Sequence, residues 1–232
     1  ISHTYQEIMS MPNAVEQYGT LECISNAVGG DLISNGLWKG IRLVDLLKTA
    51  GVKPEAKRLV LTADDGYTDS FPIEKALQPT VLLAYHLNGQ PLPPDHGFPL
   101  RLIVPGIFGM KNVKWITKIE PSDNAGFLGY WEQRGWSNVA AVKTMSRIDA
   151  PPFDAHIASG PRHVGGIAFA GDRGIQRVEV SLDAGKSWQD ASIKTPLGPF
   201  TWVLWQLDWN PAPGTYDLVV RATDKTGTPQ TQ

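Results

Sequence analysis

Residues 82–101 have the sequence L-L-A-Y-H-L-N-G-Q-P-L-P-P-D-H-G-F-P-L-R, and this stretch holds the strongest fold signals in the first half of the chain. Its apolar start predicts a strand over 81–87, and Asn88-Gly89 is a dipeptide typical of a tight hairpin turn. A proline-rich loop over 91–99 then leads to an apolar run over 100–104, which predicts another strand. The pattern therefore indicates a sheet with a long polar connection.

Short helices and strands alternate on both sides of this stretch. Thr4 and Glu7 have the spacing of a capping box at the start of a helix over 5–11. Gly51 is placed as the C-cap of a helix over 43–49. We further expect a helix over 73–77, strands over 19–24, 59–62 and 113–120, and a long loop over 26–35. This mixture predicts an α+β domain spanning residues 1–148.

The pattern changes near residue 150. Asp149-Ala150-Pro151-Pro152 resembles a linker, and no helical periodicity follows it. Short strands are expected at regular intervals over 165–170, 177–181, 201–207 and 216–222, with a hairpin loop over 183–187. This spacing is typical of a sandwich of two antiparallel sheets. We therefore predict an all-β, immunoglobulin-like β-sandwich spanning residues 149–232.

Composition excludes several classes of protein. The 232 residues are 42% hydrophobic and 19% charged, with a net charge of −2 and a pI near 6.2. Since lysine and arginine form no cluster, binding to nucleic acid is not expected. Apolar runs are of strand length, well short of the roughly 18 residues that span a bilayer. The single cysteine rules out an internal disulfide and a CxxCH haem site.

Three groups of residues could carry chemistry. Cys23 ends a predicted strand and enters a loop rich in glycine and asparagine, where its thiolate could ligate a soft metal or act as a nucleophile. A small buried hydrophobic residue is the alternative. His96 and Arg101 could bind an anion, or His96 could be an ordinary loop histidine. The sequence G-I-F-G-M-K-N-V-K over 106–114 could cradle a phosphate, or simply connect two strands.

Other motifs give little support to alternative chemistry. Asp64-Asp65-Gly66 is explained by a turn, although paired acids are the other possibility. The sequence has no HExxH, no P-loop and no GxSxG motif.

Taken together, the segments T-L-E-C-I-S-N (20–26), 82–101 and G-I-F-G-M-K-N-V-K-W (106–115) resemble the sulfite oxidase family. The tail, with R-V-E-V-S-L-D-A-G-K-S-W (177–188) and W-V-L-W-Q-L (202–207), resembles the dimerisation domain of the same family. The resemblance covers nearly the whole chain, and its segments occur in the family's order.

The resemblance implies a molybdenum–molybdopterin cofactor. Cys23 matches the cysteine whose thiolate ligates molybdenum. The positions that match pterin-binding residues are Asp65, His96, Arg101, Asn112, Val113 and Lys114. A cofactor with a soft metal at one end and an anionic group at the other accounts for all of these positions.

The chain also departs from the family pattern. Sulfite-oxidising members carry arginines just after the Cys-x-x-Asn motif, where this sequence has Ala27 and Val28. The active-site tyrosine expected beyond Trp131 and Arg134 is replaced by Trp136. We take Arg134 and Trp136, with Cys23, as candidate catalytic residues. The first domain is expected to be N-terminally incomplete, and the sandwich to lack its last strand.

The resemblance implies two-electron oxygen-atom transfer between water and a small-molecule substrate. The loss of positive charge after Cys23 makes sulfite a doubtful substrate. One alternative is an S- or N-oxide reductase on the same scaffold, and another is a cofactor-free binding or assembly module. The resemblance further implies a separate cytochrome or membrane haem protein as redox partner, a possible homodimer through the sandwich, and an extracytoplasmic, periplasmic or membrane-associated location.

Overall fold

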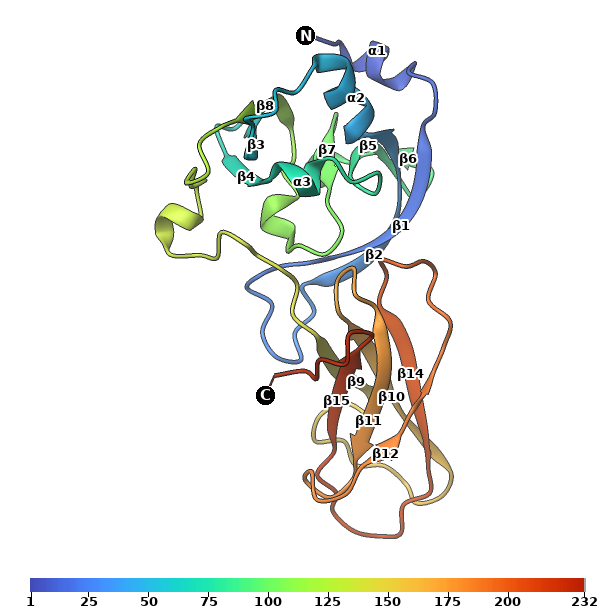
Figure 1. The fold of residues 1–232 in the computed structure, drawn as a ribbon. Helices are drawn as coiled ribbons and strands as arrows, with labels where there is room; N and C mark the ends of the chain where they lie inside the picture. Colours follow the sequence, from blue (N-terminus) through green and yellow to red (C-terminus); the bar gives the residue numbers. More distant parts are fainter. Residues whose placement is uncertain (232) are drawn as a thin grey trace. The chain divides into compact units, whose positions relative to one another are not determined.

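The computed structural model in Figure 1 describes residues 1–231. Contacts within the chain divide it into two compact units. Unit 1 comprises Ile1–Ile24 and Ser34–Ala141, and unit 2 comprises Ser25–Ile33 together with the residues from Val142 onward. Each unit has its own sheets and its own hydrophobic core.

The larger sheet of unit 1 contains the hairpin expected from residues 82–101. Its strands are β1 (Val15–Glu22), β2 (Ile33–Arg42), β5 (Leu82–Leu87), β6 (Gln90–Pro91) and β7 (Arg101–Ile103). They follow the order β1-β2-β5-β6, and β7 also pairs with β5. Asn88 and Gly89 have φ angles of 51° and 79°, the left-handed values that a tight hairpin turn requires. The predicted hairpin is confirmed.

The helices of unit 1 begin and end close to where the caps predict. In α1 (Tyr5–Met9), the Thr4 side chain accepts from the backbone of Glu7, and the Glu7 carboxylate accepts from the Thr4 amide, so the capping box is present. Helix α2 (Leu43–Ala50) ends at Gly51, which has φ +73°. The short α3 (Ile73–Ala76) follows the second sheet.

That second sheet has the order β4-β3-β8, from β4 (Thr68–Pro72), β3 (Arg58–Ala63) and β8 (Ile116–Ser122). Its inner face packs on α2 and the larger sheet in one core, with Leu43, Leu59, Leu61 and Leu102 fully buried. Three 3₁₀ turns complete the unit: η1 (Pro94–His96), η2 (Gly109–Lys111) and η3 (Glu132–Arg134). Two of them, η1 and η2, lie in the loops over 91–99 and 106–114 that hold candidate anion-binding residues.

Unit 2 is a β-sandwich. One sheet has the order β13-β14-β10-β9, from β13 (Ser192–Ile193), β14 (Val203–Trp209), β10 (Arg162–Phe169) and β9 (Met145–Ala150). The other has the order β12-β11-β15, from β12 (Gln189–Asp190), β11 (Ile175–Ser181) and β15 (Val219–Asp224). An α+β domain followed by a β-sandwich is therefore confirmed.

The sandwich core lies between its two sheets. Val164, Val178, Val180 and Ala222 are fully buried, and Trp205 is 3% exposed. The Trp205 indole donates to the Ile167 carbonyl at 2.9 Å, so its one polar atom is satisfied inside the core. Strand β9 pairs with β10 and spans residues 148–149, where the sequence placed the domain boundary.

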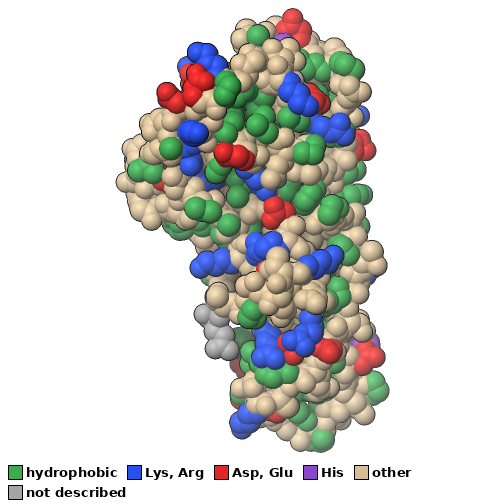
Figure 2. Space-filling view, viewed as in Figure 1, with side chains coloured by type: hydrophobic (Ala, Val, Ile, Leu, Met, Phe, Trp, Pro, Cys, Tyr) green, Lys and Arg blue, Asp and Glu red, His purple; other side chains and the backbone are tan. Residues whose placement is uncertain are grey.

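Surface charge follows the balanced composition. On the face drawn in Figure 2, basic and acidic side chains are interspersed among uncharged ones. Within residues 1–231, no helix is long and apolar enough to cross a membrane.

Candidate cofactor-binding cleft

A cleft of about 250 Å³ in unit 1 collects most of the residues singled out for cofactor binding. Its walls come from the end of β3, the β3–β4 turn, the start of β7, the η2 loop and the segment before η3. The lining residues are Ala63, Asp65, Tyr67, Arg101, Gly109, Met110, Asn112, Val113, Lys114, Trp115 and Trp131.

Arg101 is the buried cation of the cleft. It is 5% exposed; its Nη1 donates to the His96 carbonyl at 3.0 Å and its Nη2 to the Asn112 carbonyl at 3.2 Å. The guanidinium also lies 5.1 Å from the ring centre of Trp38. Burial lowers the pKa of Arg101 to about 10. Its Nε is buried and finds no hydrogen-bond partner within the described residues, so one donor of a buried cation remains to be satisfied.

Lys114 is the second cation of the cleft. Its Nζ donates to the Asp95 carbonyl at 2.9 Å and lies 4.0 Å from the centre of the Trp115 ring. Burial, and then the nearby charge of Arg101, lower the pKa of Lys114. Because neither cation has a salt bridge to a carboxylate within residues 1–231, an anion would be favoured here.

The loop of His96 supports these cations through its backbone. Gly97 has φ +106°, and a Cβ atom at this position would come within 2.9 Å of the Lys114 Cβ and 3.1 Å of the Arg101 Cβ. Glycine therefore allows the loop to approach both residues closely. The His96 side chain is exposed and is not part of the cleft lining.

Asn112 and Val113 hold the loop that carries Lys114. The Asn112 Oδ1 accepts from the Val104 amide at 2.6 Å, and its Nδ2 donates to the Phe108 carbonyl at 3.1 Å. The Val113 carbonyl accepts from Leu102 at 2.9 Å. Both residues are buried, so they fix the shape of this wall.

Asp65 lines the cleft from the turn between β3 and β4. It is exposed, and its Oδ1 accepts from the Tyr67 amide at 2.9 Å, so the expected turn is confirmed. Its carboxylate is the one acidic side chain among the residues that line the cleft.

Cys23 lies next to the cleft without being one of its lining residues. It follows β1 directly and is half-buried. A Cβ atom on Gly109, which does line the cleft, would lie 3.3 Å from the carbonyl oxygen of Glu22. The backbone beside Cys23 therefore packs against the start of η2.

Arg134 and Trp136 are on the surface and are also absent from the lining. The Arg134 guanidinium lies 3.6 Å from the ring centre of Tyr130, and its Nη1 donates to the Tyr130 carbonyl at 2.6 Å. Trp136 is 39% exposed and packs edge-on against Trp131. Trp131 is the residue of this segment that reaches the cleft.

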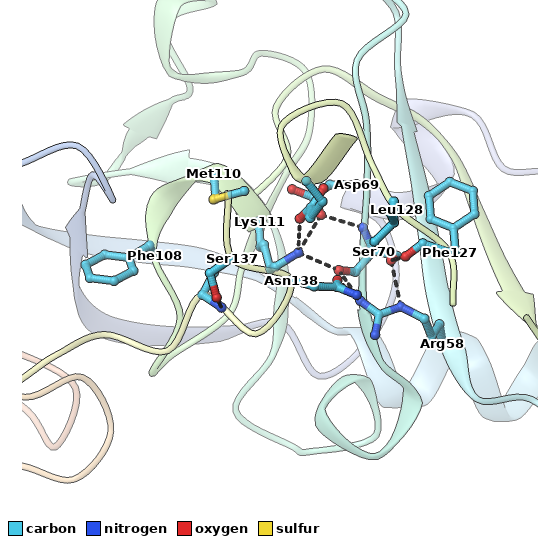
Figure 3. Close-up of polar contacts among 12 residues, drawn as sticks. Arg58, Asp69, Ser70, Phe108, Met110, Lys111, Phe127, Leu128, Ser137 and Asn138 are labelled. Carbon is cyan, nitrogen blue, oxygen red and sulfur yellow. Dashed lines mark hydrogen bonds and ion pairs between the residues drawn. The ribbon is translucent and has the colours of Figure 1, made fainter. Parts of the chain in front are cut away.

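A buried ionic cluster lies next to the cleft, with acidic residues that no sequence motif marked. Figure 3 shows the Lys111 ammonium pointing toward Asp69 and Ser70. Its Nζ lies 2.7 Å from Asp69 Oδ1 and 2.9 Å from the Ser70 carbonyl, and it also binds Glu132 Oε1. Lys111 and Asp69 are 0% exposed. Of the two lysines in the glycine-rich loop, only Lys114 therefore faces the cleft.

The two acids of this cluster differ in their pKa. Burial raises the pKa of Asp69 to about 6, although the Lys111 charge acts in the opposite direction. Burial acts on Glu132 as well, but the hydrogen bonds from Lys111 and Asp69 outweigh it and lower the pKa of Glu132. Arg58 closes the cluster by donating to Ser70 Oγ at 2.8 Å and to Asn138 Oδ1 at 2.7 Å.

Comparison with known proteins defines the class. Residues 1–131 match the model of the oxidoreductase molybdopterin binding domain, and residues 138–232 match that of the Mo-co oxidoreductase dimerisation domain. The chain belongs to the sulfite oxidase family of molybdopterin-binding oxidoreductases.

Several known proteins are similar to this chain over most of its length. Mitochondrial sulfite oxidase of Mus musculus is 33% identical over 207 residues, covering 75% of this chain and 38% of its own. Inducible nitrate reductase (NADH) 2 of Glycine max is 29% identical over 246 residues, covering 85% of this chain and 28% of its own. The crystal structure of the sulfane dehydrogenase SoxCD from Paracoccus pantotrophus superposes with a TM-score of 0.88 and 30% identity, covering 98% of this chain and 65% of that one. The chain therefore spans well under half of the mouse enzyme.

The residues present fit a molybdopterin group. The unpaired Nε of Arg101 and the ammonium of Lys114, which feels the charges of Asp95 and Asp65 but forms no salt bridge among residues 1–231, suit an anionic ligand. No group of three or more His, Cys, Asp or Glu side chains that could hold a metal occurs in residues 1–231, so a metal carried by an organic ligand and one thiolate suits this chain better than a cage of side chains.

Proposed function

We propose that this chain binds the molybdenum cofactor with the anionic part of the pterin in the cleft and with Cys23 as the metal ligand. We further propose that the protein catalyses two-electron oxygen-atom transfer between water and a small molecule. The observation that carries the proposal is the pair of cleft cations, Arg101 and Lys114, which lack a carboxylate partner within the described residues.

Each residue has a defined task in this proposal. Arg101 and Lys114 bind the anionic group, and Asn112 and Val113 keep their loop in shape. Cys23 supplies a soft thiolate to the metal. When bound, the cofactor supplies the two-electron change and the oxygen-accepting centre.

The residues that follow the Cys-x-x-Asn motif bear on which substrate the protein takes. Sulfite would need positive charge near the metal, and the positions after the Cys-x-x-Asn motif are Ala27 and Val28, both exposed and uncharged. We therefore place a less charged sulfur compound ahead of sulfite. The opposite direction, reduction of an S- or N-oxide, is the second candidate, because a relative named as a nitrate reductase is 29% identical over 246 residues.

Partners and location complete the proposal. The match to a dimerisation domain supports a homodimer through the sandwich, and its sheets of four and three strands support an immunoglobulin-like description. A separate cytochrome or membrane haem protein would exchange electrons with the cofactor. We propose an extracytoplasmic, periplasmic or membrane-associated location.

Elemental analysis for molybdenum, with an assay of released pterin, tests the proposal. Protein produced in a host that makes the cofactor should contain both in near-stoichiometric amounts. The variants Arg101→Gln and Lys114→Gln should each bind the cofactor about 10- to 100-fold more weakly, since each loses a charge-assisted hydrogen bond. Lys118→Gln is the matched control, because Lys118 is 61% exposed and its ion pair is with Glu120 in the same strand, β8.

Two outcomes would overturn the proposal. Protein without molybdenum, even after reconstitution, would favour a binding or assembly module. Cofactor retention that is equal in the Arg101, Lys114 and Lys118 variants would remove the cleft from the assignment. Oxidation of sulfur compounds by the loaded protein with an artificial acceptor, compared with oxidation of reduced viologen by S- or N-oxides, would decide the direction.

A further inference from the structure

Tyr67 connects the cleft to the buried ionic cluster. It lines the cleft and is half-buried, and its hydroxyl lies 2.9 Å from Asp69 Oδ2. The same hydroxyl lies 3.0 Å from the carbonyl oxygen of Met110, another cleft residue. Asp69 itself is 0% exposed. The Tyr67 hydroxyl therefore lies between the cleft and a carboxyl group that solvent does not reach.

The hydrogen bonds of this hydroxyl can be satisfied in two ways. Tyr67 has one hydrogen to donate and two acceptors within reach. When Asp69 is ionised, the hydrogen points to its carboxylate. When Asp69 is protonated, the acid donates to the Tyr67 oxygen, and the Tyr67 hydrogen turns to the Met110 carbonyl. The site therefore keeps good hydrogen bonds in both protonation states.

The second acid of the cluster favours uptake of one proton by Asp69. Lys111 is the ammonium that contacts both Asp69 and Glu132, and the charge of Glu132 acts to raise the pKa of Asp69. The charge of Arg58 acts on both acids from β3, but its hydrogen bonds go to Ser70 and Asn138, and Asp65 adds negative charge on the turn.

A proton on Asp69 leaves one carboxylate, that of Glu132, to pair with the buried Lys111 ammonium. Burial raises the pKa of Asp69 to about 6, close to neutral pH. Asp69 can therefore gain and lose a proton under ordinary conditions.

We propose that Asp69 is the proton acceptor of the cleft, reached through the Tyr67 hydroxyl, and that Lys111 and Glu132 are its positioning residues. A water molecule in the cleft gives one proton to the Tyr67 oxygen and remains as hydroxide, while the proton already on that oxygen passes to Asp69 Oδ2. One O–H bond breaks at the water and one at Tyr67, one forms at Tyr67 and one at Asp69, and the net result is hydroxide in the cleft and a proton on Asp69. This inference rests on the proposed function, because taking an oxygen atom from water releases two protons that must leave the cleft.

The route can be tested without turnover, by following the carbonyl stretch of protonated Asp69 in the infrared at pH 5. Asp69→Asn identifies the band, and ¹³C-labelled aspartate assigns it independently if that variant does not fold. After rapid mixing into D2O, the band of the wild-type protein should shift promptly. Tyr67→Phe should slow the shift by at least about tenfold, because it removes the proton-carrying hydroxyl.

Tyr130→Phe is the matched control. The two rings lie 5.9 Å apart, but Tyr130 is on the surface and its hydroxyl has no bond to the cluster in the described residues. Its exchange rate should equal that of the wild type. Equal rates in the Tyr67 and Tyr130 variants would overturn the route, and a carboxyl group at Asp69 that does not titrate between pH 5 and pH 7 would overturn the acceptor.

A second measurement uses the loaded protein. If Asp69 accepts a proton during turnover, Tyr67→Phe should lower kcat and flatten the acid limb of its pH profile near pH 6, with little change in molybdenum content. An unchanged profile would count against the relay. Absence of molybdenum would refute the proposed function alone, since the infrared experiment still decides the relay in the cofactor-free protein.

Discussion

Replacing Lys111 with methionine is the most direct test of how the cleft is held together. The side chain keeps nearly the same length but loses its charge. In the native protein the ammonium has three partners: Asp69, the Ser70 carbonyl and Glu132. These come from β4 and η3, and Lys111 itself ends η2, so one buried group joins three segments around the cleft.

The expected cost is large because the acids cannot reach water. The side chains of Asp69 and Glu132 are 0% and 1% exposed. Removing one partner from a buried ion pair typically costs about 3–5 kcal/mol, because the remaining charge is left uncompensated. We expect Lys111→Met to lower the unfolding free energy of unit 1 by about that amount at pH 8.

The effect should depend on pH in a defined direction. The pKa of Asp69 is raised from an ordinary value of 3.8 to about 6, so the folded state binds this proton more tightly than the unfolded chain does. Stability from this group is therefore present below pH 4 and is lost as pH rises through 6, which corresponds to about 3 kcal/mol. Without Lys111 the pKa of Asp69 rises further and Glu132 loses one cause of its lowered pKa, so the variant should be least destabilised near pH 5.

Urea unfolding followed by tryptophan fluorescence at pH 5 and pH 8 measures both quantities. Lys118→Met is the control; it removes an ammonium that is 61% exposed and should change stability by less than about 0.5 kcal/mol. If the Lys111 and Lys118 variants unfold alike at pH 8, the ionic cluster does not hold unit 1 together.

Three further outcomes follow from the structure. Cys23→Ser should retain the fold, measured by circular dichroism, but lose molybdenum and activity, because a hydroxyl is a poor substitute for a thiolate; normal turnover would refute the ligand assignment. Gly40→Ala should lower the melting temperature far more than Gly51→Ala, because a Cβ on Gly40 would collide with the Leu83 carbonyl while Gly51 faces open space; equal losses would contradict the tight β2–β5 packing. Although burial of Asp224 acts to raise its pKa, hydrogen bonds hold that pKa well below its usual value, so this carboxylate contributes stability above about pH 4 that is lost in acid. Asp224→Asn should therefore flatten the acid unfolding curve of unit 2.

Local signals in the sequence predicted the elements that depend on local physics. The Asn88-Gly89 turn, the Thr4 capping box and the Gly51 C-cap each involve residues a few positions apart, and all three are present. The sequence did not predict elements whose structure depends on pairing with a strand far away in the chain. β2 was missed because Gly36, Lys39 and Gly40 weaken its strand pattern, and its pairing with β1 and β5 is what makes it a central strand.

The candidate site shows the same division. Five of the positions singled out by resemblance line one cleft, and these are Asp65, Arg101, Asn112, Val113 and Lys114. The strand β4 and its buried Asp69 were missed, because T-D-S-F-P has the polarity of a surface segment. Its burial depends on Lys111, 42 residues away, and no short-range pattern reveals such a partner.

The origin of the cleft walls has a consequence for how the protein matures. The lining residues are spread from Ala63 to Trp131, and Lys111 joins segments 42 and 21 residues distant from it. Contacts of such sequence separation form late, after the entropy of closing the intervening loops has been overcome. The pocket is therefore expected to form at the end of chain collapse, and we expect the pterin to bind a polypeptide that has already acquired its tertiary structure.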